Sequence, residues 1–336
     1  MRKVLLFWGT FDTIHNGHLH IAKKALAETN HDALWFLLAG LSPFKEDASS
    51  FASRKDMIEL MIKDDPNLEI CDIESTLPVP SYSVDTIKAL KEKHPNTQFD
   101  WLIGSDQLDA LDQWKDIDIL KSWVTFYVYQ RPGYNNDHGF KKISGDMMDV
   151  SSTAIRQGKS YETDPLILKY MMENGLYLHT MLQSHMSEKR YNHTLSVTKL
   201  ALSLAKTHSI DLDKTMLSAM MHDYCKEWDM DTLTQIVSEY KPEALSLPKP
   251  YYHAYGASYI LKEKYQITDI EVLDAIENHV SGETDFSLGK VLFIADKCEK
   301  GRPYDASEYV RIAHQDLNKG FIAVKENQKK YLKENL

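Results

Sequence analysis

The first half of the chain alternates between two patterns of hydrophobic and polar residues. Short, almost wholly apolar runs have the length of buried strands, and longer stretches with apolar residues every three or four positions separate them. The runs predict strands over residues 4–8, 33–38, 68–73, 99–103 and 125–129. The stretches between them predict helices over residues 21–28, 53–63, 83–93 and 107–111. Because strands that alternate with helices build a parallel sheet, we expect an α/β, doubly wound, Rossmann-like first domain.

After residue 183 the strand-like runs disappear and helical periodicity takes over. One apolar helical face is formed by Val197, Leu200, Ala201, Leu204 and Ala205. Further helices are predicted over residues 215–227, 231–240, 254–265, 270–279 and 288–297. A length of 336 residues also favours two domains over one. We therefore expect an α/β domain over residues 1–183 and an all-α domain over residues 184–336.

The composition restricts the kinds of partner. Hydrophobic residues make up 43% of the chain and charged residues 26%, as in an ordinary globular protein. A net charge of −10 argues against nucleic-acid binding, which needs basic surface. Cys71, Cys225 and Cys298 have no paired spacing, so we expect neither disulfides nor a zinc ribbon. The longest apolar run, 33–41, is far shorter than the ~20 residues of a membrane span, and no signal-peptide pattern is present. We expect a cytoplasmic protein without a membrane partner, and the pattern is compatible with a homo-oligomer.

The most informative motif lies directly after the first predicted strand. Residues 9–18 read Gly-Thr-Phe-Asp-Thr-Ile-His-Asn-Gly-His and precede a helical pattern. The free amide groups and the positive dipole end of that helix favour a phosphate. The imidazoles of His15 and His18 add groups that stabilise charge on a phosphate during transfer. The motif alone predicts a nucleotide site, although such histidines can also form a helix cap.

These residues resemble the phosphate motif of the HxGH nucleotidyltransferases. Residues 150–156, Val-Ser-Ser-Thr-Ala-Ile-Arg, resemble the second signature of that family. Four further blocks lie between the two signatures in the order found in bacterial nicotinate-nucleotide adenylyltransferases: residues 81–86, residues 104–106, Trp114 and residues 131–133. The resemblance covers about residues 1–182. It implies transfer of AMP from ATP to nicotinate mononucleotide with release of pyrophosphate, and Mg²⁺ that arrives with ATP.

The resemblance also implies roles for individual residues. The catalytic group is His15, His18 and Arg156. The ATP-binding group is Gly9, Thr10, Phe11, Gly17, Gly104, Asp106, Ser151, Ser152 and Thr153. The substrate-binding group is Lys45, Tyr82, Ser83, Trp114 and Arg131. Trp114 can equally cover the core, and Lys45 can equally be a solvated loop lysine.

Two positions depart from the family pattern. Trp8 stands where members usually have Gly, and Thr13 stands where they usually have Pro. Trp8 places bulk where close backbone approach is usual. The alternative acceptors that remain open are nicotinamide mononucleotide and a pantetheine phosphate.

The second domain carries six residues of metal-ligand type. They are His193, His222, Asp223, His253, His279 and Asp296. Mixed imidazole and carboxylate groups suit borderline divalent ions such as iron, manganese or zinc. The adjacent His222-Asp223 pair and the order of the set resemble HD-domain phosphohydrolases of the two-metal type. The resemblance implies a catalytic, bridging Asp223, with His193, His222 and Asp296 on one ion and His253 and His279 on the other. Paired metals activate water and hold both oxygens of a phosphate displacement.

The residues that flank these ligands narrow the resemblance. With Arg190, Lys226 and Arg302, the pattern resembles the bacterial HD hydrolases that split diadenosine tetraphosphate into two ADP. The resemblance implies that these three side chains bind phosphate oxygens, although each can equally be a surface charge. The usual His-Thr-x-Gly is His-Val-Ser-Gly at residues 279–282, and the usual Glu-Pro is Glu-Lys-Gly at residues 299–301. Two alternatives remain open for this domain, another nucleotide substrate and a non-catalytic nucleotide sensor.

Overall fold

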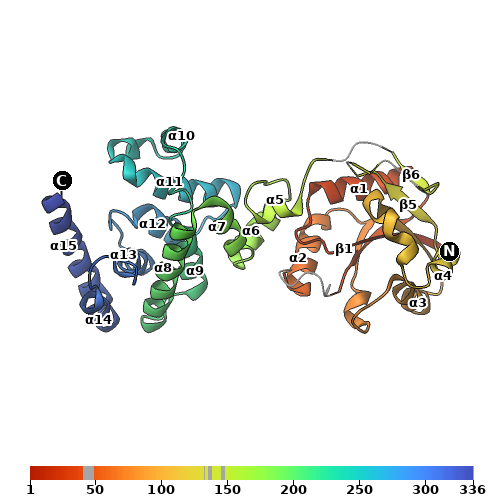
Figure 1. Cartoon of the computed structure of the whole chain (residues 1–336), viewed down its shortest axis with the longest axis horizontal. Helices are drawn as coiled ribbons and strands as arrows, with labels where there is room; N and C mark the ends of the chain where they lie inside the picture. The colour runs from red at the N-terminus through yellow and green to blue at the C-terminus, as the bar shows by residue number, and fades with distance from the viewer. Residues whose placement is uncertain (41–48, 132, 135–137, 145–147, 336) are drawn as a thin grey trace. The chain divides into compact units, whose positions relative to one another are not determined.

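A computed structural model describes residues 1–40, 49–131, 133–134, 138–144 and 148–335. The chain divides into two compact units, Met1–Ile167 and Leu168–Leu336 (Figure 1). This division lies N-terminal to the boundary after residue 183 that the sequence pattern suggests, and the helices between the two positions belong to the second unit. Each unit is described by itself below.

The first unit contains a sheet of six parallel strands in the order β3-β2-β1-β4-β5-β6. The strands are β1 Arg2–Gly9, β2 Ala33–Leu38, β3 Leu68–Cys71, β4 Thr97–Gly104, β5 Phe126–Tyr129 and β6 Lys141–Ile143. In the centre of the sheet, Val4 of β1 lies opposite Ala33 of β2 and Phe99 of β4. The predicted fold class is confirmed. The strand order reverses between β1 and β4, which is the place where open α/β sheets bind ligands.

Helices connect the strands and cover both faces of the sheet (Figure 1). They are α1 Asn16–Glu28, α2 Phe51–Ile62, α3 Ser83–Lys93, α4 Ile117–Trp123 and α5 Ser152–Arg156, with 3₁₀ segments η1 Ile73–Thr76 and η2 Ser105–Gln113. The prediction of a strand as far as residue 73 was wrong, because Ile73 begins η1. The helix predicted over residues 107–111 is the 3₁₀ segment η2. Strand β6 was not predicted.

All regular secondary structure in the described residues of the second unit is helical. Its helices are α6 Pro165–Glu173 (which begins in the first unit), α7 Leu178–His185, α8 Glu188–Thr207, α9 Leu212–Met221, α10 Met230–Tyr240, α11 Tyr252–Tyr259, α12 Ile270–Asn278, α13 Ser287–Cys298, α14 Ser307–Gln315 and α15 Leu317–Asn335. Short 3₁₀ segments η3 Pro242–Ser246 and η4 Lys249–Tyr251 precede α11, and the π-helical turn η5 Ile260–Lys264 follows it.

Two of the predicted helices in this unit are shorter than expected. The helix predicted over residues 215–227 ends at Met221, and the next six residues form turns. The helix predicted over residues 254–265 leaves α-helical geometry after Tyr259. None of the helices in the described part of the chain combines the length and apolar character that a membrane crossing requires.

Candidate active sites

A cavity of about 730 Å³ opens at the carboxyl ends of the central strands of the first unit. Most residues predicted for nucleotide binding line it: Gly9, Thr10, Phe11, His15, His18, Tyr82, Ser83, Asp106, Arg131, Ser151, Ser152, Thr153 and Arg156. Residues from both ends of the first unit's sequence therefore meet in one space. Lys45 lies outside the described residues.

Three predicted residues do not line this cavity. Gly17 lies in α1, where a Cβ atom would come within 3.0 Å of Nδ1 of His15, so glycine allows the close approach of that ring. Gly104 ends β4, and a side chain there would collide with the Asp106 carboxylate. Trp114 packs against the core, edge-on to Trp101 with 6.1 Å between the ring centroids. Stacking of Trp114 on a substrate ring stays a prediction.

His15 and His18 form a closely packed pair at the start of α1. Their ring centroids lie 3.8 Å apart, and the backbone N–H of His15 donates to Nδ1 of His18 over 3.3 Å. Burial, with help from Arg131, lowers the pKa of His15 to about 4. Burial also holds the pKa of His18 well below its usual value. Both rings are therefore neutral near pH 7, and His18, which accepts at Nδ1, carries its proton on Nε2.

The second signature is bonded directly to the first. The Arg156 guanidinium donates to the backbone carbonyl of Asp12 and, over 3.3 Å, to the hydroxyl of Thr153. The hydroxyl of Ser152 donates to the carbonyl of Thr13 over 2.8 Å. These bonds hold α5 against the loop before α1, so its hydroxyls and cation face the same cavity as the two histidines.

A buried glutamate that was not predicted closes one end of the cavity. Glu74 accepts hydrogen bonds from the backbone N–H of Gly40 (3.0 Å), the indole N–H of Trp8 (3.2 Å) and the hydroxyl of Thr86 (3.2 Å). It joins the ends of β1 and β2 to α3, beside Tyr82. Burial raises the pKa of this carboxyl group. Trp8, the departure from the family pattern, thus has a specific partner.

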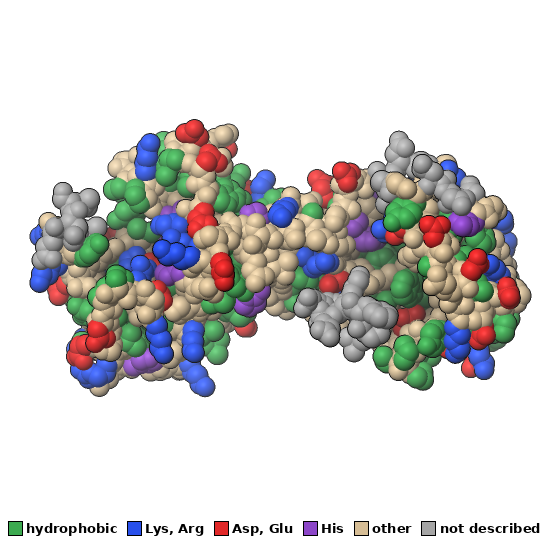
Figure 2. Space-filling view, in the orientation of Figure 1, with side chains coloured by type: hydrophobic (Ala, Val, Ile, Leu, Met, Phe, Trp, Pro, Cys, Tyr) green, Lys and Arg blue, Asp and Glu red, His purple; other side chains and the backbone are tan. Residues whose placement is uncertain are grey.

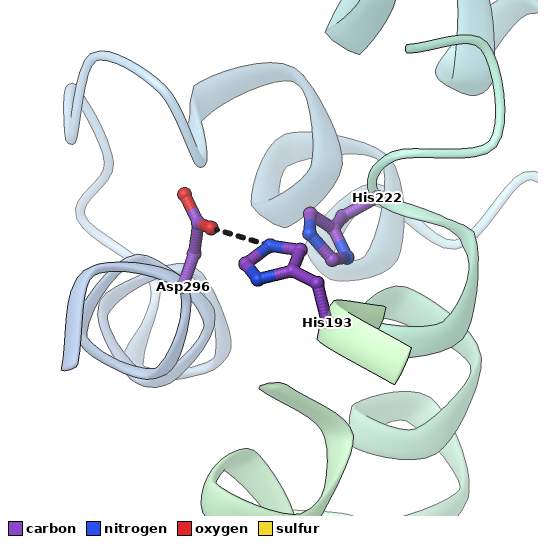
Figure 3. A group of neighbouring side chains, drawn as sticks. All are labelled: His193, His222 and Asp296. Carbon is purple, nitrogen blue, oxygen red and sulfur yellow. Dashed lines mark ion pairs between the residues drawn. The ribbon is translucent and has the colours of Figure 1, made fainter. Parts of the chain in front are cut away.

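All six predicted metal ligands of the second unit converge on one centre. They come from α8, the turn after α9, α11, the end of α12, and α13. Asp223 lies in the middle, with Nε2 of His253 at 3.1 Å, of His222 at 3.5 Å and of His279 at 3.6 Å from its carboxylate oxygens. His193 and Asp296 approach within 3.2 Å, and His222 lies beside them (Figure 3). Two groups of possible ligands result: His193, His222 and Asp296, and His222, Asp223 and His279.

The hydrogen bonds of His193 and His222 leave the inner nitrogens of these two imidazoles available. His222 and His279 each face a backbone carbonyl through Nδ1 over 2.7 Å, those of Ala219 and Ile276. A carbonyl only accepts, so Nδ1 carries the proton and Nε2 keeps its lone pair. Nε2 of His222 and of His193 is buried and makes no hydrogen bond among the described residues. Buried lone pairs without a donor fit a bound cation.

The electrostatics agree with such a centre. Burial lowers the pKa of His222 to about 4 and also lowers the pKa of His279. Burial alone would raise the pKa of Asp223, but the neighbouring imidazoles of His222 and His253 hold it well below its usual value. Neutral imidazoles beside ionised carboxylates are the protonation states that metal binding requires.

Among the described residues, four cationic side chains lie at the centre. Arg190 pairs with Asp223 over 2.7 Å, Arg302 pairs with Asp296 over 2.6 Å, and Nζ of Lys226 lies 3.4 Å from both ring nitrogens of His253. Lys297, which was not predicted, pairs with Asp296 over 2.6 Å. Basic side chains lie next to histidines on the face of this unit shown in Figure 2. A polyanion at the centre would meet several donors.

Comparisons with known proteins assign each unit to a family. Residues 6–158 match the cytidylyltransferase-like family, and residues 190–301 match the HD domain family. A Mycoplasma genitalium protein named "Probable nicotinate-nucleotide adenylyltransferase/Ap4A hydrolase" is 29% identical over 340 residues, which cover 96% of each chain. The Bacillus subtilis nicotinate-nucleotide adenylyltransferase is 36% identical over 187 residues, which cover 53% of this chain and 99% of that relative. A solved structure titled as a predicted HD superfamily hydrolase involved in NAD metabolism, from Clostridium acetobutylicum, is 27% identical. It covers 47% of this chain and 86% of that chain with a TM-score of 0.44.

The chain thus joins a cytidylyltransferase-like nucleotidyltransferase domain to an HD domain. Through its N-terminal domain it belongs to the nicotinate-nucleotide adenylyltransferase family. Both resemblances found in the sequence are confirmed at this level.

Proposed function

We propose that the chain is a bifunctional enzyme. The N-terminal domain transfers AMP from ATP to nicotinate mononucleotide, and the HD domain hydrolyses diadenosine tetraphosphate to two ADP. The main observation behind this proposal is that each unit brings its signature residues together. The histidines of HxGH line one cavity with Ser151, Ser152, Thr153 and Arg156, and the six HD ligands converge on one centre. The M. genitalium relative that aligns with nearly the whole chain bears a name with the same two activities.

In the first domain the reaction needs positioning and charge stabilisation rather than a covalent nucleophile. A phosphate oxygen of the mononucleotide attacks the α-phosphorus of ATP, and the bond from that phosphorus to the β-phosphate bridge breaks to release pyrophosphate. His18 donates its Nε2–H to the α-phosphate, and neutral His15 lies beside it. Arg156, Ser152 and Thr153 hold the β- and γ-phosphates. Mg²⁺ bound to the phosphates and water would neutralise part of their charge.

The acceptor occupies the end of the cavity formed by the start of α3. Tyr82 is the N-cap residue of α3, and its side chain makes no capping hydrogen bond. The first backbone N–H groups of the helix are therefore available to a carboxylate. This supports the acid, nicotinate mononucleotide, over the amide. Initial rates with both mononucleotides test the choice, and His18→Ala should abolish adenylyl transfer to either one. Equal rates with the amide would favour nicotinamide mononucleotide as the acceptor.

In the second domain the residues that would hold two divalent ions are His193, His222, Asp223, His253, His279 and Asp296, and Asp223 would serve both ions. The ions would make water a stronger nucleophile and would stabilise the charge on the phosphate under attack. Arg190, Lys226 and Arg302 bind the phosphate oxygens of the chain between the two adenosines. Water adds to the second phosphorus from one adenosine, the bond to the central bridging oxygen breaks, and two ADP leave.

The decisive experiment is product analysis. The full-length protein, reconstituted separately with Mn²⁺, Fe²⁺ or Zn²⁺, is incubated with diadenosine tetraphosphate, and the nucleotides are separated by chromatography. ADP as the sole product, lost in Asp223→Ala and retained in the surface variant Asp305→Ala, supports the proposal. AMP plus ATP would contradict symmetrical cleavage. Binding without turnover would favour the sensor alternative.

A further inference from the structure

Glu299 is a buried carboxylate directly behind one of the proposed metal ligands. It follows the end of α13, its residue surface is only 4% exposed, and its Oε1 lies 3.2 Å from Nδ1 of His193. On its other side Oε2 accepts from the backbone N–H of Gly301 over 2.6 Å. The hydroxyl of Ser196, one turn after His193 on α8, also donates to it. The carboxylate is therefore held in place independently of His193.

The position of Glu299 decides which nitrogen of His193 carries the proton. Carboxylates, which only accept when ionised, lie 3.2 Å from both ring nitrogens of His193, but only the contact between Nδ1 and Glu299 has hydrogen-bond geometry. The proton of the neutral imidazole therefore lies on Nδ1. Nε2 then keeps its lone pair, and it points to Asp296 at 3.2 Å and Asp223 at 3.7 Å. His222 and His279 obtain the same orientation from backbone carbonyls. His193 is oriented by a side chain, that of Glu299, so its orientation can be tested by substitution.

Gly301 is required for this arrangement. A Cβ atom at position 301 would lie 2.9 Å from Oε1 and 3.0 Å from Oε2 of Glu299. The first distance is shorter than unbonded atoms allow and the second is very tight, and hydrogen bonds on several sides hold the carboxylate in place. A side chain at position 301 would therefore displace Glu299 from His193.

We propose that Glu299 is a positioning residue that fixes the tautomer and orientation of His193 and thereby sets the metal affinity of the HD centre. This inference rests on the proposed metal binding of the second domain. Outer carboxylates of this kind typically change metal affinity by ~10–100-fold when they are removed.

Glu299→Gln is the sharpest variant because it preserves shape. Its single amide oxygen is retained by the N–H of Gly301, which leaves the amide NH₂ facing Nδ1 of His193. Nδ1 must then accept, the proton moves to Nε2, and an N–H points into the centre where a lone pair is needed. Gly301→Ala should also remove the bond between Glu299 and His193, because the added methyl group displaces the carboxylate. Glu308→Gln, at an exposed glutamate paired with Arg311, is the matched control.

The test is Mn²⁺ binding to the full-length chain, measured by calorimetry and by electron paramagnetic resonance of free Mn²⁺. We expect Glu299→Gln and Gly301→Ala to raise the Kd by about 10–100-fold and Glu308→Gln to leave it unchanged. Imidazole ¹H–¹⁵N spectra, assigned with His193→Gln, should show the His193 proton on Nδ1 in the wild type and on Nε2 in Glu299→Gln. Circular dichroism in chelator confirms that each variant is folded.

Two results would overturn the inference: an unchanged Kd in folded Glu299→Gln, or a wild-type His193 with its proton on Nε2. If the wild type binds no Mn²⁺, the proposed function of the domain fails instead, and the spectra still decide the tautomer. If Glu299→Gln does not fold, the Mn²⁺ affinity of Gly301→Ala is compared with that of the wild type instead.

Discussion

At the scale of single residues, both sites are built around buried, neutral histidines. The pKa of His15 and that of His222 are each lowered to about 4 by burial. An unfolded histidine has a pKa near 6.5, so between about pH 6.5 and 4 the unfolded chain binds protons that the folded chain excludes. The stability conferred by the neutral rings is complete above about pH 6.5 and is lost as the pH falls toward 4.

This linkage predicts a pH-dependent effect of His15→Gln. For a group with these two pKa values, the free energy of unfolding should fall by about 2 kcal/mol between pH 7 and pH 5. The variant lacks the titrating ring, so its loss over the same range should be smaller by about that amount. Urea unfolding at the two pH values measures the difference. Equal losses in variant and wild type would show that His15 titrates normally in the folded state.

The Trp8–Glu74 contact leads to a prediction about the acceptor end of the first cavity. The indole N–H donates to Glu74, which also accepts from Thr86 on α3 next to the proposed acceptor site. Trp8→Phe keeps an aromatic ring and removes the donor, a loss of about 1 kcal/mol for one hydrogen bond. We expect the KM for nicotinate mononucleotide to rise by roughly fivefold, with the KM for ATP unchanged.

Trp123→Phe is the control for that prediction. Trp123 packs, partly buried, on the core of the same domain and does not line the cavity. It should change neither KM. If Trp8→Phe raised both KM values equally, the bond would support the cavity as a whole rather than its acceptor end.

At the scale of helices and strands, a strand can be predicted from the sequence when the sheet buries it on both faces. Every residue of β2 Ala33–Leu38 is buried, so it reads as one apolar run with clear limits. Strand β6 Lys141–Ile143 has three residues and only Ile143 is buried, so no apolar run marks it. The end of α9 was missed because the apolar pattern continues through Tyr224 and Cys225, which are buried although they lie in turns.

The same reasoning explains which site residues were found. The metal-ligand set and the two phosphate signatures have spacings that stand out in sequence. Glu74 and Lys297 have no such spacing, because a single acidic or basic residue looks like any solvated one until tertiary contacts bury or pair it. Glu299 belongs to a sequence motif, but the motif does not show that its carboxylate is buried against His193. Trp114 is the opposite case. It belongs to a sequence motif, but the motif does not show that its ring packs on the core.

The crossing of α14 and α15 yields a stability prediction in which two effects oppose each other. Alanine is favoured over glycine in a helix by about 1 kcal/mol. A Cβ atom at Gly320, however, would lie 2.5 Å from Cα and 2.9 Å from the backbone N of Ala313. Backbone cannot move aside like the end of a side chain, so steric overlap should win. We expect Gly320→Ala to lower the free energy of unfolding by about 1–3 kcal/mol.

Urea unfolding followed by circular dichroism tests this, with Lys319→Ala as the neighbouring control. The side chain of Lys319 is 77% exposed and forms a surface ion pair with Asp316, so its removal should change stability by no more than about 0.5 kcal/mol. A Gly320→Ala protein more stable than the wild type would mean that the two helices separate at no cost.

At the scale of the whole molecule, metal binding should stabilise the second domain selectively. A ligand that binds only the folded state adds RT ln(1 + [L]/Kd), which is about 2.7 kcal/mol at a hundredfold excess over Kd. Because the described ligand groups all lie in the second unit, Mn²⁺ should raise the unfolding transition of that unit alone. Calorimetry of the full chain with Mn²⁺ and with chelator measures this, and Asp223→Ala should abolish the shift. A shift in both transitions would show coupling between the units.

Separate cores also predict that the two activities can be removed independently. Each unit has its own compact set of contacts, and each candidate site is built from residues of one unit. His18→Ala should therefore lower adenylyl transfer by about 10²–10³-fold and leave hydrolysis intact, and Asp223→Ala should do the reverse.

Mixing the two variants tests whether the sites act independently. In an equimolar mixture, half of the chains have an intact transferase site and the other half have an intact hydrolase site. If the sites act independently, it should form nicotinate adenine dinucleotide and ADP at half the rates of the same total amount of wild type. Rates well below half would mean that each site needs an intact second site in the same chain, which would give the fusion of the two domains a mechanistic reason.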